Sequence, residues 1–150
     1  MKKVAIIDFG MNNLKSICSA LKYLGCNPTV INKKNSLDNF NFIILPGVGT
    51  YSFAMNFLKK TKLDVSIKNC AKNNKNILGI CLGMQLLFDE SEEFGKHKGL
   101  SILKGKIKSL KKIKNDLQVP NIGWHNLEKN KMLNNKELIK FDKKKYEYFI

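Results

Sequence analysis

The sequence predicts an α/β fold in which helices cover both faces of an open, mostly parallel sheet. Short apolar runs typical of buried strands alternate along the chain with segments whose apolar residues recur at helical spacing. This alternation is typical of β-α-β units, in which consecutive strands run parallel. A chain of 150 residues can bury a sizeable core, so we expect residues 1–150 to form one domain.

Four apolar runs are the predicted strands, namely residues 4–8, 28–31, 42–45 and 77–80. Amphipathic segments predict helices over residues 14–24, from Thr50 through Leu58, and from Asp64 onward. Thr50 and Asp64 are expected to cap their helices, because side chains of these types accept hydrogen bonds from free N–H groups. A further helix is expected to begin at Leu82 or Gly83.

The second half of the chain carries weaker patterns. Apolar residues alternate with lysine over residues 99–110, which predicts an exposed strand or hairpin. A weak helix is expected over residues 133–139, and a strand from Tyr146 to Ile150.

The most informative stretch is Gly79-Ile80-Cys81-Leu82-Gly83, which lies between a predicted strand and a predicted helix. This is the cysteine version of a nucleophile elbow, a strand-turn-helix corner that raises one reactive side chain above a sheet. The two glycines fit a turn that is too tight for a Cβ on either side of the cysteine. The free N–H groups at the start of the helix would favour the thiolate, which is the nucleophilic form of Cys81.

Two further loops are expected beside this corner. The polar turn after Asp8 and the glycine-rich loop 46–49 each follow a predicted strand, as Cys81 does. In a parallel sheet, ligands bind at the carboxyl ends of the strands. Glycines in such a loop let backbone N–H groups face a ligand. The sequence therefore predicts a site at this edge, built from three separate segments.

Composition limits the classes of function. The formal net charge is +15 and comes from lysine alone, since the sequence has no arginine, so bidentate recognition by guanidinium groups is excluded. We interpret the lysines as a solvated surface and expect no nucleic-acid partner. The four cysteines lack metal-ligand spacing, so we expect reduced thiols and no metal site. Neither a signal peptide nor a membrane span is visible, and a cytoplasmic location is expected.

Motifs along the whole chain resemble the class I glutamine amidotransferases. They occur in the family's order and with compatible spacing, at residues 6–11, 46–49 with 54–55, 78–88 with 91–93, and 119–120 with 123–124. The Met84-Gln85-Leu86-Leu87-Phe88 continuation and Ser91-Glu92-Glu93 are similar to the glutaminase subunits of imidazole glycerol phosphate synthase in particular. The resemblance implies a flavodoxin-like sheet and the hydrolysis of glutamine to glutamate and ammonia, without a cofactor.

The resemblance also implies roles for residues around the corner. Cys81 would attack the glutamine carboxamide and form a γ-glutamyl thioester, while the backbone N–H groups of Leu82 and Val48 would hold the oxyanion. Four further residues would bind the amino-acid end of glutamine, namely Gly47, Gly49, Gln85 and Glu93.

The same resemblance implies a partner. Ammonia would pass through a tunnel into a (β/α)8-barrel cyclase subunit of histidine biosynthesis. Asn12, Asn13 and Trp124 would lie near the interface of that heterodimer.

The main departure from the family is the absence of its catalytic histidine. The family uses a Cys–His–Glu triad whose histidine and glutamate follow a strand similar to residues 148–150, where this sequence stops. His97, which we expect in a surface turn, and His125 stand at other positions. A cysteine nucleophile needs a partner that exchanges protons with it. We therefore expect a domain that is incomplete at its carboxyl end and catalytically impaired by itself.

Three alternatives stay open at this point. Met11-Asn12-Asn13-Leu14 differs from the family's usual residues at the expected interface, so the chain could supply ammonia to a partner that modifies surface-glycan sugars. A non-catalytic module that docks a partner is compatible with the incomplete triad. A basic nucleic-acid binder is the third alternative, although no aromatic-basic recognition motif is present.

Overall fold

The computed structural model describes residues 1–33, 37–113, 119–126 and 146–149. Its contacts divide the chain into two compact units, Met1–Lys108 and Ser109–Ile150. The larger unit contains the parallel sheet and the Cys81 corner, and the smaller unit contains Trp124.

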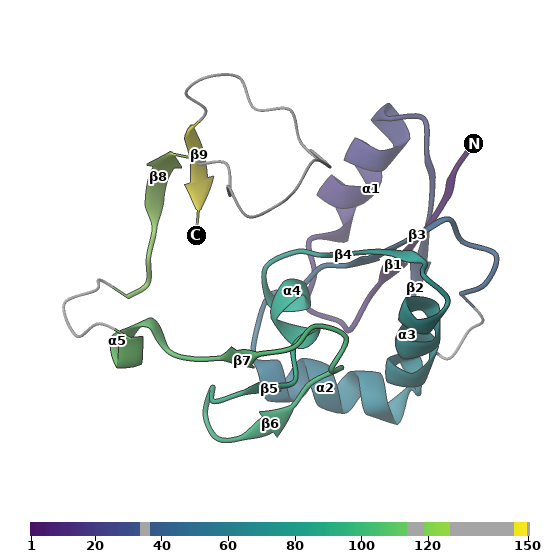
Figure 1. Ribbon diagram of the computed structural model, residues 1–150. Coiled ribbons are helices and arrows are strands. Elements are labelled where there is room, and N and C mark those ends of the chain that lie inside the picture. The colour runs from purple at the N-terminus through teal and green to yellow at the C-terminus, as the bar shows by residue number, and fades with distance from the viewer. Residues whose placement is uncertain (34–36, 114–118, 127–145, 150) are drawn as a thin grey trace. The chain divides into compact units, whose positions relative to one another are not determined.

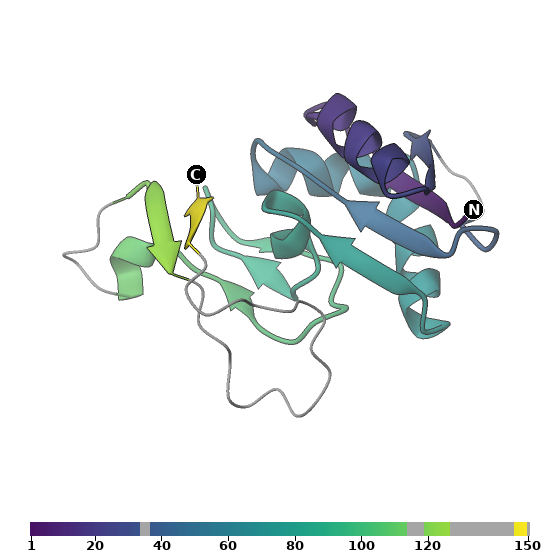
Figure 2. The same cartoon turned by 90° about the horizontal axis from the view of Figure 1, so that it is seen from above.

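Four parallel strands form the sheet of the larger unit, in the order β2–β1–β3–β4 (Figure 1). They are β1 (Lys3–Ile7), β2 (Asn27–Ile31), β3 (Phe42–Leu45) and β4 (Asn76–Gly79), which confirms the four predicted strands to within one residue at each end. In the register, Ala5 of β1 pairs with Thr29 on one side and with Ile43 on the other. Figure 2 shows these strands side by side in one layer.

Helices flank this sheet on both sides, as the sequence predicts (Figure 1). On one face lies α1 (Leu14–Tyr23), and on the other lie α2 (Tyr51–Lys60) and α3 (Leu63–Lys72). The main core combines side chains of the sheet with those of α2 and α3, among them Ile7, Leu45, Leu58 and Ile67. No residue of α1 is fully buried, so that face of the sheet is covered less completely.

The two predicted helix caps differ from the structure. Thr50 does occupy the N-cap position of α2 with extended backbone angles, but its side chain makes no capping hydrogen bond. Lys62, with a φ of 58°, precedes α3, so the prediction that Asp64 is its cap is wrong. Asp64 lies in the first turn instead, where a carboxylate still interacts favourably with the helix dipole.

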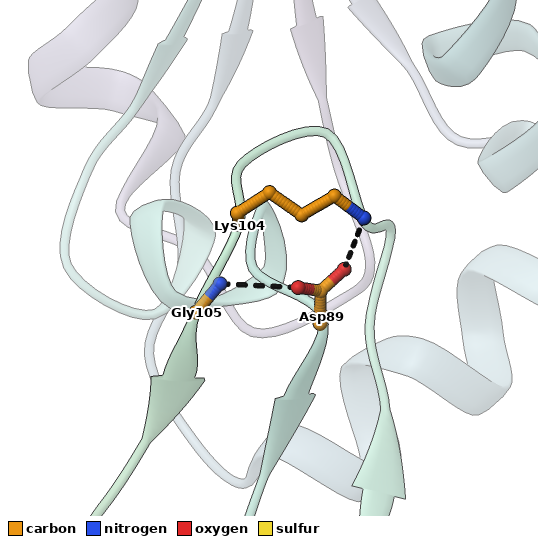
Figure 3. A network of polar contacts seen from close by, with 3 residues as sticks. All are labelled: Asp89, Lys104 and Gly105. Atoms are coloured by element: carbon orange, nitrogen blue, oxygen red, sulfur yellow. Dashed lines mark hydrogen bonds and ion pairs between the residues drawn. The ribbon is translucent and has the colours of Figure 1, made fainter.

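A small three-stranded sheet of order β6–β5–β7 follows the corner, formed by β5 (Glu90–Ser91), β6 (His97–Lys98) and β7 (Lys106–Ile107). Asp89, just before β5, accepts a hydrogen bond from the Gly105 N–H at 3.0 Å and lies 3.6 Å from the Lys104 ammonium (Figure 3). The Gly105 hydrogen bond is the main reason why the pKa of Asp89 is lowered. This network holds the strand ends of β5 and β7 together.

The prediction of an exposed strand or hairpin over residues 99–110 is wrong for most of that stretch, because only the two residues of β7 are a strand. The N–H groups of Leu100 and Ile102 instead donate to the carbonyls of Leu86 and Leu87, each at 2.9 Å. These carbonyls lie at the end of α4 (Leu82–Leu86), where a helix leaves its last acceptors free. The segment therefore satisfies a helix end instead of pairing as a strand.

The smaller unit contains α5 (Leu110–Ile113) and an antiparallel pair of strands, β8 (Gly123–Asn126) and β9 (Tyr146–Phe149). Trp124 pairs with Tyr148, and their ring centroids lie 5.4 Å apart. The predicted strand at 146–150 is confirmed for its described residues, whereas the predicted helix over 133–139 falls outside them. None of the helices in the described ranges has the length and apolar character that crossing a membrane requires.

Tyr51, the first residue of α2, is the largest fully buried side chain in the described part of the chain. Its hydroxyl makes no hydrogen bond among those residues. Burial raises the pKa of Tyr51 to about 12, and the carboxylates of Asp89 and Glu90 act in the same direction. The core therefore accommodates the neutral phenol but not the phenolate.

Tyr51→Phe is expected to make stability less sensitive to high pH. Folding raises the pKa of this phenol from 10.0 to about 12. The free energy of unfolding of the wild type is therefore unaffected by this group below pH 10, and falls by about 2–3 kcal/mol as the pH rises from 10 through 12. The variant lacks this loss, and near pH 8 it is neutral or stabilising by up to about 1 kcal/mol, since no hydrogen bond is broken. Urea unfolding near pH 8 and near pH 11, where about half of this loss has occurred, measures both effects.

The matched control is Tyr23→Phe, because Tyr23 is exposed on α1. The control is expected to keep the wild-type pH dependence. If Tyr51→Phe loses as much stability as the wild type between the two pH values, the phenol is not the group responsible.

Candidate active site

Three loops meet at the carboxyl edge of the parallel sheet, as the sequence predicts. The Val48 N–H donates to the Met11 carbonyl at 3.2 Å, which joins the loop after β3 to the loop after β1. The Leu82 N–H donates to the Gly47 carbonyl at 3.3 Å, which joins the corner after β4 to the same loop. The strand order reverses between β1 and β3, and ligands of open α/β sheets bind at such a point.

Cys81 occupies the N-cap position of α4 with a φ of 54° and a ψ of −119°. A positive φ is rare for a residue with a Cβ, and such strain costs about 1–3 kcal/mol. The residue is exposed, and within the described ranges no hydrogen bond or ion pair reaches its thiol. An exposed side chain held in a strained corner between a strand and a helix has the geometry of a nucleophile elbow.

Gly79 and Gly83 allow this corner to pack tightly. A Cβ on Gly83 would fall 1.6 Å from the Leu45 carbonyl oxygen, and a Cβ on Gly79 would fall 2.5 Å from the Cα of Met84. Both neighbours are backbone atoms in a close-packed region, so they cannot turn aside as the end of a side chain can. The predicted reason for the two glycines, a turn too tight for a Cβ on either side, is confirmed.

The two N–H groups that we expect to bind an oxyanion already donate hydrogen bonds in this structure. Those of Leu82 and Val48 are directed at the carbonyls of Gly47 and Met11. Gly49 has a φ of 98°, and a Cβ there would fall 2.6 Å from the Met11 Cε, so the loop lies directly against Met11. An oxyanion bound in this conformation would have to displace two backbone acceptors.

Glu93 reaches the same edge through a hydrogen bond with a residue 42 positions earlier. Its Oε2 accepts the Tyr51 N–H at 2.7 Å. Because Tyr51 begins α2, Glu93 satisfies one of the N–H groups that have no partner within the helix. Gln85 lies four residues after Cys81 and is half-buried, and residues four apart share one side of a helix.

Asn12 and Asn13 follow β1 and make different contacts. The Asn12 Nδ2 donates to the Asp8 carboxylate at 3.1 Å, and the Gly10 N–H donates to the same oxygen at 2.8 Å, so both bonds shape the loop. Asn13 is exposed and its Oδ1 accepts a hydrogen bond from Ser16. Trp124 belongs to the smaller unit and is 70% exposed. The place of these three residues at a partner interface stays a prediction.

The two histidines lie in different units of the chain. His97 pairs with Ser91 in the β5–β6 sheet and is half-buried, so the prediction of a surface turn is wrong. Its Nε2 is buried and makes no hydrogen bond among the described residues. His125 lies exposed in β8 of the smaller unit. Within the larger unit, therefore, no histidine forms a hydrogen bond with the Cys81 thiol. The described residues also contain no cluster of three or more side chains that could hold a metal ion.

Three contributors to the site were not predicted. Met11 acts through its carbonyl and Tyr51 through its N–H, and backbone groups of this kind carry no residue-specific pattern. Ser91 contributes a side chain, since its Oγ accepts the Glu93 N–H. The Ser-x-Glu spacing is compatible with such a local turn and could have indicated it.

The family described as Glutamine amidotransferase class-I matches residues 5–148 of this chain. The imidazole glycerol phosphate synthase subunit HisH of Geobacillus kaustophilus is 44% identical over 127 residues, which are 83% of this chain and 60% of that protein. The subunit HisH of Bacillus subtilis is 42% identical over 150 residues, which are 98% of this chain and 69% of that protein.

A solved structure described as "Crystal structure of glutamine amidotransferase" has a TM-score of 0.66 at 18% identity, and the match covers 82% of this chain and 62% of that one. At this level of identity the likeness shows the fold alone. The chain spans about 60% of the length of the first curated relatives it matches.

Gly83→Ala is expected to disrupt the corner. The added methyl group would overlap the Leu45 carbonyl, and overpacking of this kind costs about 1–3 kcal/mol or more. Gly25→Ala is the control, because Gly25 has a φ of 72° but open space around it, so only backbone strain of about 1 kcal/mol is expected. Urea unfolding of both variants measures the difference. A smaller loss for Gly83→Ala than for Gly25→Ala would contradict the steric explanation.

Cys81→Gly is expected to be more stable than Cys81→Ala by about 1 kcal/mol. Both variants lack the thiol, but only glycine adopts the positive φ without strain. The same pair of substitutions at Cys26, whose φ is not positive, should favour alanine. Thermal unfolding of the four variants gives the two differences. If both positions favour alanine, the backbone at Cys81 is not strained.

Proposed function

Because the chain belongs to the class-I glutamine amidotransferase family, we propose that it binds glutamine at the carboxyl edge of its parallel sheet and uses Cys81 as a nucleophile. The observation that carries this proposal is the strained, exposed Cys81 at the start of α4, bonded through Leu82 to the loop after β3. An exposed thiol flanked by backbone N–H groups suits attack on a carboxamide carbon.

In the proposed reaction, the Cys81 Sγ forms a bond to the carboxamide carbon and the carbonyl oxygen takes up the displaced electron pair. The N–H groups of Leu82 and Val48 would bind this oxyanion after leaving the carbonyls of Gly47 and Met11. A donor of this kind typically lowers the barrier by about 3–4 kcal/mol. Breaking the carbon–nitrogen bond, with a proton delivered to nitrogen, releases ammonia. Water then hydrolyses the γ-glutamyl thioester to glutamate and restores the thiol.

Glu93 and Gln85 bind the amino-acid end of glutamine in this proposal. The Tyr51 N–H holds the Glu93 Oε2, which leaves Oε1 for the substrate ammonium in a charge-assisted hydrogen bond. Gln85, together with the backbone of Gly47 and Gly49, would complete the surroundings of the substrate.

We also propose that ammonia passes to a (β/α)8-barrel cyclase subunit, where it enters imidazole glycerol phosphate in histidine biosynthesis. This is supported by the relatives from Geobacillus kaustophilus and Bacillus subtilis, which are named as subunits of imidazole glycerol phosphate synthase. Asn12, Asn13 and Trp124 are the residues proposed for the interface. A direct passage suits ammonia, because in bulk water near neutral pH it is protonated and no longer nucleophilic.

The 150-residue chain by itself is expected to bind glutamine without turning it over appreciably. Release of ammonia needs a general acid, and such a group contributes about 10²–10⁴ to the rate. In the larger unit no such group is bonded to the Cys81 thiol. Glutamine should slow the alkylation of Cys81 by iodoacetamide, followed by mass spectrometry of the Cys81 peptide so that Cys18, Cys26 and Cys70 do not interfere.

The second measurement is glutamate release by the wild type and by Cys81→Ala, which should be indistinguishable. Release that depends on Cys81 would show that the chain already holds its proton donor. A Cys81 alkylation rate that glutamine leaves unchanged would overturn the binding proposal itself, and would favour a module that only docks a partner.

A further inference from the structure

Ser91 is a buried polar residue, with 1% of its surface exposed. Its Oγ accepts the Glu93 N–H at 3.1 Å. It lies in β5, which pairs with β6 on one side and with β7 on the other. Ser91 is therefore held in place by the small sheet and offers a fixed acceptor to Glu93.

Glu93 is anchored at two points that belong to different elements. Its backbone is held by Ser91 of β5, and its carboxylate is held by the N–H of Tyr51 at the start of α2. The N–H of the preceding residue, Glu92, donates to the Ile107 carbonyl of β7 at 3.1 Å. Both the main chain before Glu93 and the end of its side chain are thus constrained.

We propose that Ser91 is a positioning residue for the substrate: it holds Glu93 where its second carboxylate oxygen, Oε1, meets the ammonium group of glutamine. This rests on the proposed function, in which Glu93 binds that ammonium group. The bond from Tyr51 occupies Oε2 only, and a carboxylate keeps acceptor sites on its other oxygen.

The physical reason is preorganisation. A glutamate side chain that becomes ordered only when a ligand binds loses rotamer freedom, which weakens binding. A side chain that is already fixed at its backbone and at its carboxylate avoids most of this loss. Removal of the Ser91 hydroxyl would leave the Glu93 N–H without its partner and release the turn that orients the residue.

The experiment compares two ligands, glutamine and glutaramic acid, which is glutamine without its amino group. For each, the concentration that halves the rate of Cys81 alkylation by iodoacetamide is measured on the 150-residue chain. Ser91→Ala is expected to weaken protection by glutamine about five- to tenfold and to leave protection by glutaramic acid unchanged. A serine that only fills space would affect both ligands alike, so this difference in selectivity identifies positioning.

Glu93→Asp provides a second variant that leaves the buried serine intact. It keeps the charge but is one methylene shorter, so it cannot meet both the Tyr51 N–H and the ammonium group, and the same loss of selectivity is expected. Ser19→Ala, at an exposed position on α1, is the control and should behave as the wild type.

The outcomes separate this inference from the function on which it rests. If glutamine protects the wild type better than glutaramic acid and Glu93→Asp loses that preference, but Ser91→Ala keeps it, positioning by Ser91 is overturned and the glutamine site stands. If glutamine does not protect the wild type, the proposed function fails and the inference fails with it.

Discussion

The close approach of α4 to the carboxyl end of β3 is the constraint on which the candidate site depends. Because Gly83 lies against the Leu45 carbonyl, the helix starts with almost no connecting chain after β4. The backbone completes this change of direction at Cys81, which takes a positive φ and projects from the sheet. The same proximity brings the Leu82 N–H to the Gly47 carbonyl. One backbone contact thus sets both the strain at the thiol and the position of the neighbouring loop.

Around this corner the site is completed by contacts between segments that are far apart in the chain. The loop after β1 contributes the Met11 carbonyl, and the small sheet contributes Glu93. Both bond to the segment that runs from the end of β3 to the first residue of α2, and the corner bonds to it through Leu82. This segment is therefore bordered by three other parts of the larger unit. A fixed carboxylate of this kind suits an ammonium group. The N–H groups of Leu82 and Val48, in contrast, are engaged by the carbonyls of Gly47 and Met11 in this conformation.

Features with a local pattern could be predicted from the sequence, and features that depend on distant backbone partners could not. The alternation of apolar runs and amphipathic segments predicted the parallel sheet, and the Gly-x-Cys-x-Gly pattern predicted the corner at Cys81. The stretch after Gly99 was mistaken for a strand because its alternation is real, while the N–H groups of Leu100 and Ile102 are needed at the end of α4. Every residue has similar backbone groups, so no residue type marks which of them will pair.

The hydrogen bond between Glu93 and Tyr51 also affects the order in which the chain folds. The first N–H group of α2, that of Tyr51, has its acceptor 42 residues later in the chain. Closing so long a loop costs more entropy than closing the short loop of a helical turn. During synthesis, Cys81 leaves the ribosome before Glu93 does. Cys81 is therefore present in the nascent chain before the carboxylate that anchors the start of α2, and this edge of the sheet is completed only after its cysteine has been made.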